Sequence, residues 1–245
     1  MRKIAIFVEG LAEQIFVREM LLRVYGYTNV GIQCYKLHAQ RDEKAPYPFP
    51  NGGDAGPEEQ DNYYMIVNVE GENMVLSAIK SRITRLQDVG FEKIIGLRDM
   101  YCDEYHRHSK RQIDNSVSER FIRGHDKQIE LIPHQELIRF FFAIMEVEAW
   151  FLGFEEIFSR IDPKLTTSYI REQTGIDLTN DPETTIYHPA EAIRQIFLLI
   201  DKTYKKHEHE ISSIIDTLTK EDYLLLAENS SHCSTFKCFY NELIT

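Results

Sequence analysis

The sequence predicts an α/β protein, in which a mostly parallel sheet is flanked by helices and followed by a helical C-terminal subdomain. Three observations lead to this prediction. Over residues 4–143, short continuous apolar runs alternate with stretches of helical apolar spacing, which is typical of a buried parallel sheet with connecting helices. Strand patterns stop after Trp150. The chain of 245 residues, 43% hydrophobic and 27% charged, has an ordinary globular composition.

The first predicted elements are a strand and a helix. Residues 4–8 are continuously apolar and end at Glu9-Gly10. Over residues 11–25, apolar side chains recur at helical spacing, and Gly26 supplies a helix stop. We expect the chain to turn sharply from the strand into the helix at the glycine.

A second strand is predicted at residues 31–37, and the segment after it has a different composition. Residues 38–62 hold four prolines and three glycines, which predicts a long loop of the kind that is usually functional or disordered. The alternation of strands and helices then resumes. Its predicted elements are a strand at 63–69, a helix at 73–89, a strand at 93–97, a polar loop at 102–115, a helix at 116–125, and strands at 129–132 and 137–143.

The last part of the chain carries no strand pattern. Residues 155–245 show short stretches of helical spacing, most clearly at 188–204. We therefore predict an α/β domain at residues 1–152 and a helical subdomain at residues 153–245.

Composition and motifs exclude several classes of protein. No apolar stretch approaches the roughly 20 residues of a membrane span, and the N-terminal apolar run is shorter than a signal-peptide core of about 7–15 residues. We therefore expect a cytoplasmic protein that makes no membrane contact. The four cysteines are too few for a disulfide framework. The absence of GxxxxGK[ST] and GxSxG motifs argues against an ATPase or a serine hydrolase.

Carboxylates stand where the predicted strands end. Glu9 and Asp99 each follow a buried apolar run, Glu13 lies four residues after Glu9, and Glu146 and Glu148 follow the last strand. Ligands of open α/β sheets bind at the carboxyl ends of the strands. Several carboxylates in one place repel one another unless a cation neutralises them. Oxygen-only ligands suit Mg²⁺ or Mn²⁺, the usual ions of phosphoryl chemistry.

Ordinary structural roles also explain some of these residues. Glu13 fits the solvated face of an amphipathic helix, and Glu148, just before Ala149, fits a cap at a helix N-terminus. Glu9 and Asp99 are harder to explain in this way, because each directly follows a buried strand.

A basic stretch follows the second of these strand ends. The net charge of −11 is unfavourable for binding nucleic acid over a broad surface. Arg107, Lys110 and Arg111 nevertheless lie close together shortly after Asp99. They are our candidates for nucleic-acid contacts, and a solvated polar loop is the alternative.

Residues 6–17, with the sequence IFVEGLAEQIFV, resemble the first motif of TOPRIM domains. These are the catalytic modules of topoisomerases, primases and OLD-type nucleases, and the motif is a strand, then Val-Glu-Gly, then a helix. A second glutamate four positions on, here Glu13, is similar to the nuclease branch. The resemblance covers about residues 1–150 and implies a TOPRIM-like, Rossmann-like sheet.

The second TOPRIM motif, Asp-x-Asp, is present only in part. Asp99 stands in the right place, but position 101 is Tyr101, and Asp103 does not match. The same departure, followed by a Glu-x-Glu-Ala-Trp segment as at residues 146–150, resembles small uncharacterised TOPRIM-like bacterial proteins. Those are often encoded near SMC/ABC-type ATPases in anti-phage loci. Losing one carboxylate weakens a two-metal site, which leaves three readings open: Glu146 or Glu148 replaces it, one ion is bound, or catalysis is lost.

The resemblance implies a nuclease that cleaves nucleic acid, DNA or RNA, with Mg²⁺ or Mn²⁺. It makes Glu9 and Asp99 catalytic, and Glu9, Glu13, Asp99 and Glu148 metal ligands. An SMC/ABC-type ATPase is the implied partner, and a homo-oligomer stays open. Lys220 and Lys237 are candidates for an assisting lysine.

Two rival hypotheses belong to other classes. A non-catalytic interaction or regulatory subunit would keep the fold and lose the chemistry, and Tyr101 in place of an aspartate supports it. A receiver-like phosphotransfer module would also gather acidic residues at strand ends. It normally has a lysine after the last strand, and the segment directly after Ala143 offers none.

Overall fold

The computed structural model describes residues 2–37, 47–48, 60–71, 74–229 and 231–244. The chain divides into two compact units. The first unit comprises Met1–Arg98 and Glu119–Phe142, and the second comprises Asp99–Ser118 and Ala143–Thr245. These units interleave along the chain, whereas the sequence-based division is a single cut after residue 152. The sequence-based division at residue 152 therefore remains a prediction, namely that residues 1–152 and 153–245 fold as separate domains.

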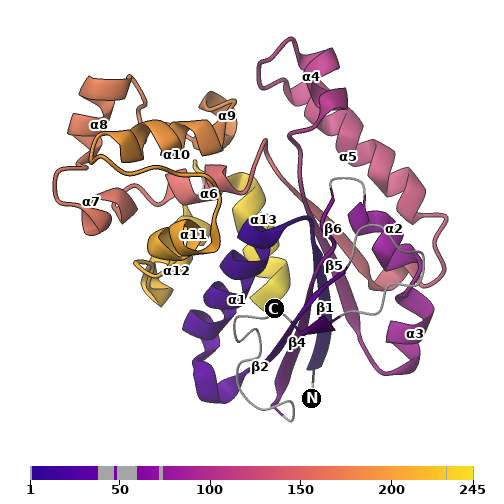
Figure 1. The fold of residues 1–245 in the computed structure, drawn as a ribbon. Coiled ribbons are helices and arrows are strands. Elements are labelled where there is room, and N and C mark those ends of the chain that lie inside the picture. The colour runs from indigo at the N-terminus through magenta and orange to yellow at the C-terminus, as the bar shows by residue number, and fades with distance from the viewer. Residues whose placement is uncertain (1, 38–46, 49–59, 72–73, 230, 245) are drawn as a thin grey trace. The chain divides into compact units, whose positions relative to one another are not determined.

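The first unit is built on a parallel sheet of five strands with helices on its faces (Figure 1). In sheet order the strands are β2 (Gly31–Lys36), β4 (Asn62–Asn68), β1 (Arg2–Val8), β5 (Lys93–Asp99) and β6 (Ile138–Ala143). A two-residue strand, β3 (Tyr47–Pro48), pairs antiparallel with β2 at the edge of the sheet. The predicted α/β class with a mostly parallel sheet is confirmed. Because β1 and β5 are neighbours, their carboxyl ends lie side by side.

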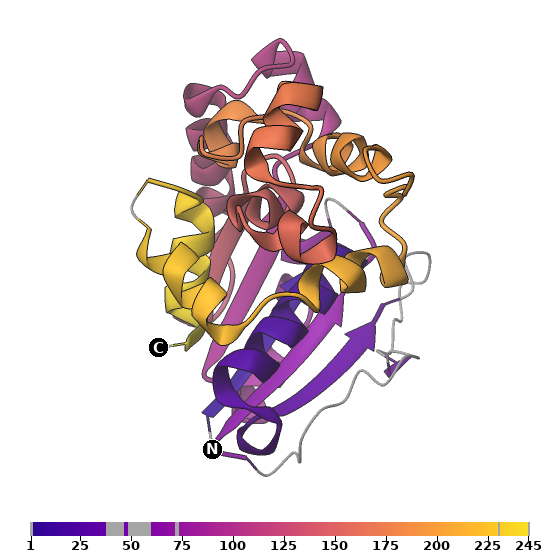
Figure 2. The same cartoon turned by 90° about the vertical axis from the view of Figure 1, so that its left-hand side faces the viewer.

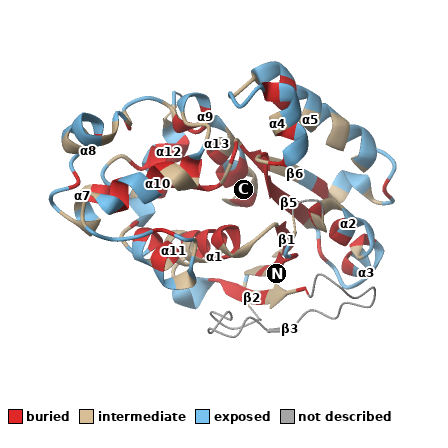
Figure 3. Ribbon diagram, turned by 45° about the horizontal axis from the view of Figure 1, so that its top comes forward, coloured by how far each residue is buried: buried red, intermediate tan, exposed pale blue. Residues whose placement is uncertain are grey.

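Helices cover both faces of this sheet. Helix α1 (Leu11–Tyr25) lies along one face, where it packs on β4 (Figure 2). Helices α2 (Met74–Lys80) and α3 (Ile83–Asp88) lie on the opposite face (Figure 3). A single 3-10 turn, η1 (Tyr27–Asn29), connects α1 to β2.

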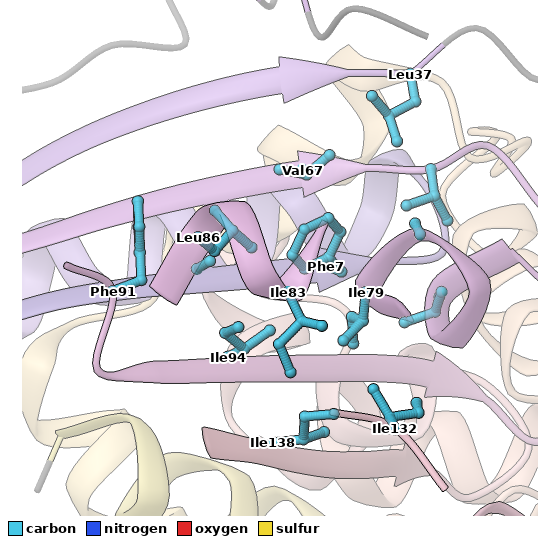
Figure 4. Close-up of a cluster of buried hydrophobic side chains, with 14 residues drawn as sticks. Phe7, Leu37, Val67, Ile79, Ile83, Leu86, Phe91, Ile94, Ile132 and Ile138 are labelled. Carbon is cyan, nitrogen blue, oxygen red and sulfur yellow. The ribbon is translucent and has the colours of Figure 1, made fainter. Parts of the chain in front are cut away.

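The face beneath α2 and α3 holds a continuous apolar cluster (Figure 4). Phe7 of β1 and Ile94 of β5 meet Ile79 of α2 and Ile83 of α3 in this cluster, and all four are at most 1% exposed. Burying side chains of this size contributes about 1.5–3 kcal/mol each. The packing therefore stabilises β1 and β5 together with α2 and α3.

The predicted helix at residues 11–25 is confirmed at both ends. Its last carbonyls are satisfied by Gly26, whose backbone N–H donates to the carbonyl of Leu22 at 2.9 Å. Gly26 has φ +82°, a left-handed conformation that favours glycine. Local sequence was therefore sufficient to predict this helix.

The strands predicted at 31–37, 63–69, 93–97 and 137–143 are also present, with ends shifted by up to two residues.

The single helix predicted at residues 73–89 is wrong, because α2 and α3 are separate helices. Ser81 interrupts the run, and its hydroxyl donates to the carbonyl of Ala78 at 3.0 Å. The chain then makes a tight turn at Arg82, whose N–H donates a hydrogen bond to the carbonyl of Ile79. The regular helix pattern is thus lost at Arg82, whose N–H bonds to the carbonyl three residues before it instead of four.

The polar loop predicted at residues 102–115 is wrong as well, because α4 (Asp103–Ser109) lies within it. The helix has Asp103 and Glu104 in its first turn and basic residues in its last, which complements the helix dipole. Its one aromatic residue besides the histidines, Tyr105, is fully buried, and the Tyr105 hydroxyl lies 3.0 Å from the hydroxyl of Ser118. Tertiary contacts thus stabilise a helix that the polar local sequence does not predict.

Two further predicted elements differ from those in the structure. The strand predicted at 129–132 is absent, because α5 (Asn115–Ile129) extends to its first residue and a turn follows, with the N–H of Ile132 on the carbonyl of Ile129. The helix predicted at 188–204 is the shorter α10 (Pro189–Leu198), followed by Asp201 at φ +56°. Most of the loop predicted at 38–62 lies outside the described residues.

The second unit is helical, and its described residues after Ala143 contain no strand. The predicted helical C-terminal portion is confirmed. Besides α10, the helices after Ala143 are α6 (Glu148–Gly153), α7 (Ile157–Ile161), α8 (Thr167–Thr174), α9 (Pro182–Thr185), α11 (Glu208–Ile215), α12 (Lys220–Glu228) and α13 (Ser234–Ile244). None of the described helices is long and apolar enough to cross a membrane.

Trp150, the only tryptophan of the chain, lies at the centre of the helical core. Its ring centroid is 5.5 Å from that of Phe236 and 5.4 Å from that of Phe239. Its indole N–H donates to the buried carboxylate of Glu183 at 2.9 Å. Trp150 fluorescence therefore reports on the folding of the second unit.

Candidate functional site

Glu9 and Glu13 lie in the first unit, at the carboxyl end of β1. The Glu13 side chain is buried, with 4% of its surface exposed. A Cβ atom at Gly10 would lie 3.1 Å from Oε2 of Glu13, closer than a normal contact. The glycine of the Val-Glu-Gly turn therefore leaves room for this carboxylate.

Glu9 has a buried cation beside it. Arg98, the residue before the end of β5, is 5% exposed, and its Nε lies 3.8 Å from Oε2 of Glu9. A guanidinium nitrogen of Arg98 lies 3.2 Å from Nε2 of His125, whose Nδ1 lies 3.1 Å from the carbonyl of Phe121. With the proton on Nδ1, His125 accepts from Arg98 and holds it in place. Neither Arg98 nor His125 is predicted from the sequence as part of a site.

Asp99 belongs to the second unit and joins two segments of it. Its Oδ1 accepts a hydrogen bond from the N–H of Val147 at 2.9 Å, and the side chain is largely buried. The backbone beyond Asp99 continues the pairing, since the N–H of Tyr101 donates to the carbonyl of Met145 at 2.7 Å. Asp99 is therefore held next to the Glu-x-Glu segment.

Lys206 lies between the two glutamates of that segment. Its ammonium is 2.8 Å from Oε1 of Glu146 and 3.1 Å from Oε2 of Glu148. The other oxygen of Glu148 accepts from the hydroxyl of Tyr204 at 2.8 Å. The other oxygen of Glu146 accepts from the N–H of Ala190 at 3.0 Å, near the start of α10. We call Asp99, Glu146, Glu148 and Lys206 the carboxylate cluster.

Burial and charge act in opposite directions on the protonation of this cluster. Burial raises the pKa of Glu148, and Lys206 counteracts part of that rise. Burial by itself lowers the pKa of Lys206, but the carboxylates of Glu148, Glu146 and Asp99 outweigh it and raise the pKa above its ordinary value. Lys206 therefore stays an ammonium at neutral pH.

A pocket of about 840 Å³ lies in the same unit. We call it the basic pocket, and it is lined by Tyr101, Asp103, His106, Arg107, Arg111 and His188. Arg107 and Arg111 are both exposed. The expected contribution of these two arginines to an anion-binding surface is thus compatible with their positions, whereas Lys110 does not line the pocket.

Aromatic side chains pack against one another at the basic pocket. The rings of Tyr101 and His106 meet edge to face, with centroids 4.2 Å apart. His106 shares a hydrogen bond with the hydroxyl of Tyr187 through its Nδ1. The ring of Tyr187 in turn packs edge to face on His188 at 4.7 Å. Four rings from two distant segments therefore hold one another in place.

Tyr101 connects the basic pocket to the carboxylate cluster. Burial raises the pKa of Tyr101, the Glu146 carboxylate raises it further, and the Arg111 guanidinium acts in the opposite direction. His188, which lines the pocket, lies two residues from Ala190, the backbone donor to Glu146. The basic pocket and the carboxylate cluster are therefore built on the same two segments of the chain.

The acidic members of the cluster offer carboxylate oxygens, the type of donor that a hard divalent cation prefers. With all groups ionised, three carboxylates face one ammonium in a largely buried place. That imbalance favours either a further cation or a proton. Among the described residues, no group of three or more His, Cys, Asp or Glu side chains is arranged to hold a metal ion. Lys206 takes the central cationic position between the two glutamates.

The four predicted metal ligands are thus divided between the units, Glu9 and Glu13 in the first, Asp99 and Glu148 in the second. From the sequence, Glu148 ranks ahead of Glu146, but in the structure the two glutamates share one lysine. The assisting lysines expected from the sequence are Lys220 and Lys237, and Lys206 is not among them. No local pattern marks Lys206, because it comes to the cluster from about sixty residues away.

The fold and these residues define an α/β protein with acidic groups and a basic, aromatic pocket in one of its units. Comparison with protein-family models, curated proteins and solved structures finds no match to the chain. The function is therefore inferred from the chain's own residues.

Proposed function

We propose that the chain is a divalent-metal-dependent nuclease that cleaves phosphodiester bonds in nucleic acid. The observation that supports this most is that the carboxylate cluster and the basic pocket meet at Tyr101 within one unit. Phosphodiester cleavage needs carboxylates for a metal ion and cationic groups for the phosphate. The second unit contains both the carboxylates and the cationic groups. Of these groups, Asp99 and Arg107 lie a few residues apart in the segment that contains Tyr101.

Each group has a defined part in this proposal. Asp99, Glu146 and Glu148 would hold Mg²⁺ or Mn²⁺, and such an ion activates water and stabilises charged oxygens when bound. Arg107 and Arg111 bind the phosphate, because a guanidinium presents two parallel donors to its oxygens. Lys206 limits the repulsion between the glutamates.

The resemblance of residues 6–17 extends the proposal to a TOPRIM-like fold. The neighbouring positions of β1 and β5 in the sheet support it. Glu9 remains the candidate acid/base residue and Glu13 a candidate ligand. Action with an SMC/ABC-type ATPase in anti-phage defence is part of the same proposal.

A second candidate function is a non-catalytic interaction or regulatory subunit. A specific observation favours it, namely that both oxygens of Glu146 and both oxygens of Glu148 already accept hydrogen bonds from groups of the protein. In that case Lys206 is a permanent counter-ion, and the cluster binds no metal.

Cleavage assays on the full chain separate the two. Plasmid, single-stranded DNA and total RNA are incubated with Mn²⁺, Mg²⁺ or EDTA. We expect metal-dependent cleavage that falls by about 100-fold or more in Asp99→Asn and Glu148→Gln, and Glu9→Ala shows whether the first unit takes part. The exposed Glu221→Gln is the matched control.

Thermal unfolding with and without Mn²⁺ completes the test. A metal-induced rise in melting temperature that disappears in Glu148→Gln supports the metal site, even where a partner is needed for cleavage. No cleavage together with no rise would overturn the nuclease proposal in favour of the interaction subunit.

A further inference from the structure

The two arginines of the basic pocket are available to an anion. Among the residues that the structure describes, neither guanidinium forms an ion pair with a carboxylate. Arg107 donates from its Nε to the backbone carbonyl of Asp103 at 3.2 Å, a bond that does not use its two terminal nitrogens. Asp103 is the only carboxylate among the lining residues, so the pocket is cationic on balance.

Its aromatic side chains add a second kind of contact. Tyr101 and His188 line the same pocket, and their ring centroids lie 5.5 Å apart. His106 packs against Tyr101 and Tyr187 packs against His188, which restricts the motion of both lining rings. Flat, restrained rings beside cationic groups are the usual means by which proteins hold unpaired bases together with their phosphates.

The volume of the pocket also limits its ligand. Pockets for small ligands enclose about 300–1,000 Å³, and 840 Å³ falls within that range. A nucleotide fits such a space, whereas a base in a duplex is stacked and paired and reaches it only after it has been flipped out at a cost.

We infer that the basic pocket binds an unpaired nucleotide, with its phosphate on Arg107 and Arg111 and its base against Tyr101 and His188. Resting on the proposed function, this makes single-stranded nucleic acid the substrate class. The same chemistry would accept a free nucleoside monophosphate.

Fluorescence anisotropy of the full chain in EDTA tests the inference apart from cleavage. The probes are a short labelled single strand and the same sequence as a blunt duplex. We expect the single strand to bind at least about tenfold more tightly. Arg107→Gln and Arg111→Gln should each weaken binding and lower the dependence on salt concentration, by about 0.7 in log–log slope for each phosphate that the variant no longer neutralises.

Arg171→Gln is the matched control, because Arg171 is an exposed arginine of the same unit that pairs with Asp177 and does not line the pocket. We expect it to leave single-strand binding unchanged. Tyr101→Leu should weaken binding by about 5- to 150-fold through loss of stacking, and Tyr101→Phe should retain it. Unchanged Trp150 fluorescence confirms that each variant is folded.

Competition distinguishes the sources of the ligand. Displacement of the strand by a nucleoside monophosphate, with little effect of inorganic phosphate, supports a nucleotide pocket. Equal displacement by inorganic phosphate would overturn it. So would equal binding of duplex and single strand, or equal effects of Arg171→Gln and Arg111→Gln. Single-strand binding with neither metal-dependent cleavage nor a metal-induced rise in melting temperature would overturn only the nuclease proposal.

Discussion

The Lys206 ammonium lies 3.1 Å from Oε2 of Glu148, a carboxylate with no solvent-exposed surface. The pair joins the start of α6 to the segment before α11. Since Glu146 accepts from the same ammonium, one positive charge holds two glutamates that would otherwise repel. This relationship governs both the stability of the second unit and any metal binding by it.

Replacing Lys206 by methionine should lower the free energy of unfolding. Removing one partner of a fully buried ion pair costs about 3–5 kcal/mol. The Lys206 side chain is 39% exposed, so solvent screening reduces the expected loss to about 1–3 kcal/mol. Urea unfolding followed by Trp150 fluorescence measures it.

Lys205→Met is the control, because Lys205 is the exposed neighbour of Lys206. If the cluster binds a divalent ion, Mn²⁺ should stabilise Lys206→Met more than the wild type, since the ion replaces the lost positive charge. Equal stability of the Lys205 and Lys206 variants would contradict the role assigned to this ammonium.

Glu148 should make stability depend on pH. Burial raises its pKa above the ordinary value of 4.5, so the folded chain holds a proton that the unfolded chain has released. Stability from this group is present at low pH and is lost as pH rises from 4.5 through the folded pKa, by at most about 1.4 kcal/mol per pH unit. Glu148→Gln carries no titrating group and should lack this decline.

Urea unfolding of the wild type and Glu148→Gln at a series of pH values from 4.5 upward measures the difference. The exposed variant Glu221→Gln should follow the wild type. Parallel curves for the wild type and Glu148→Gln would show that burial does not control this carboxylate.

Gly96→Ala should destabilise the sheet of the first unit. A Cβ atom at Gly96 would lie 2.5 Å from a ring carbon of Phe140 and 3.1 Å from a methyl carbon of Ile79. Overpacking of this kind costs about 1–3 kcal/mol. Gly124→Ala is the counterpart, because outside its chain neighbours and the backbone of its own helix no atom lies within 4 Å of its new Cβ.

Alanine is the better helix former, so Gly124→Ala in α5 should be neutral or stabilising by up to about 1 kcal/mol. Urea unfolding followed by far-ultraviolet circular dichroism compares the two. Loss of stability in both variants, or in neither, would contradict the packing described for β5.

Local sequence was sufficient for the elements whose cause is local. The apolar run of β1, the helical spacing of α1 and the left-handed Gly26 lie within one short stretch of chain, and the structure has them as predicted. Local sequence was not sufficient for α4. Its buried Tyr105 is satisfied by Ser118, beyond the end of the helix, and composition alone predicted a loop.

The sequence by itself determined that carboxylates stand at or shortly after the ends of β1, β5 and β6, because each of these strands is an apolar run that an acidic residue ends or soon follows. Only the tertiary structure decided that Lys206 joins Glu146 and Glu148 and that His188 joins Tyr101. Both come from segments that lie far along the chain from their partners. Contacts of this kind depend on how helices pack, and side-chain packing between distant segments leaves no periodic signal in either segment.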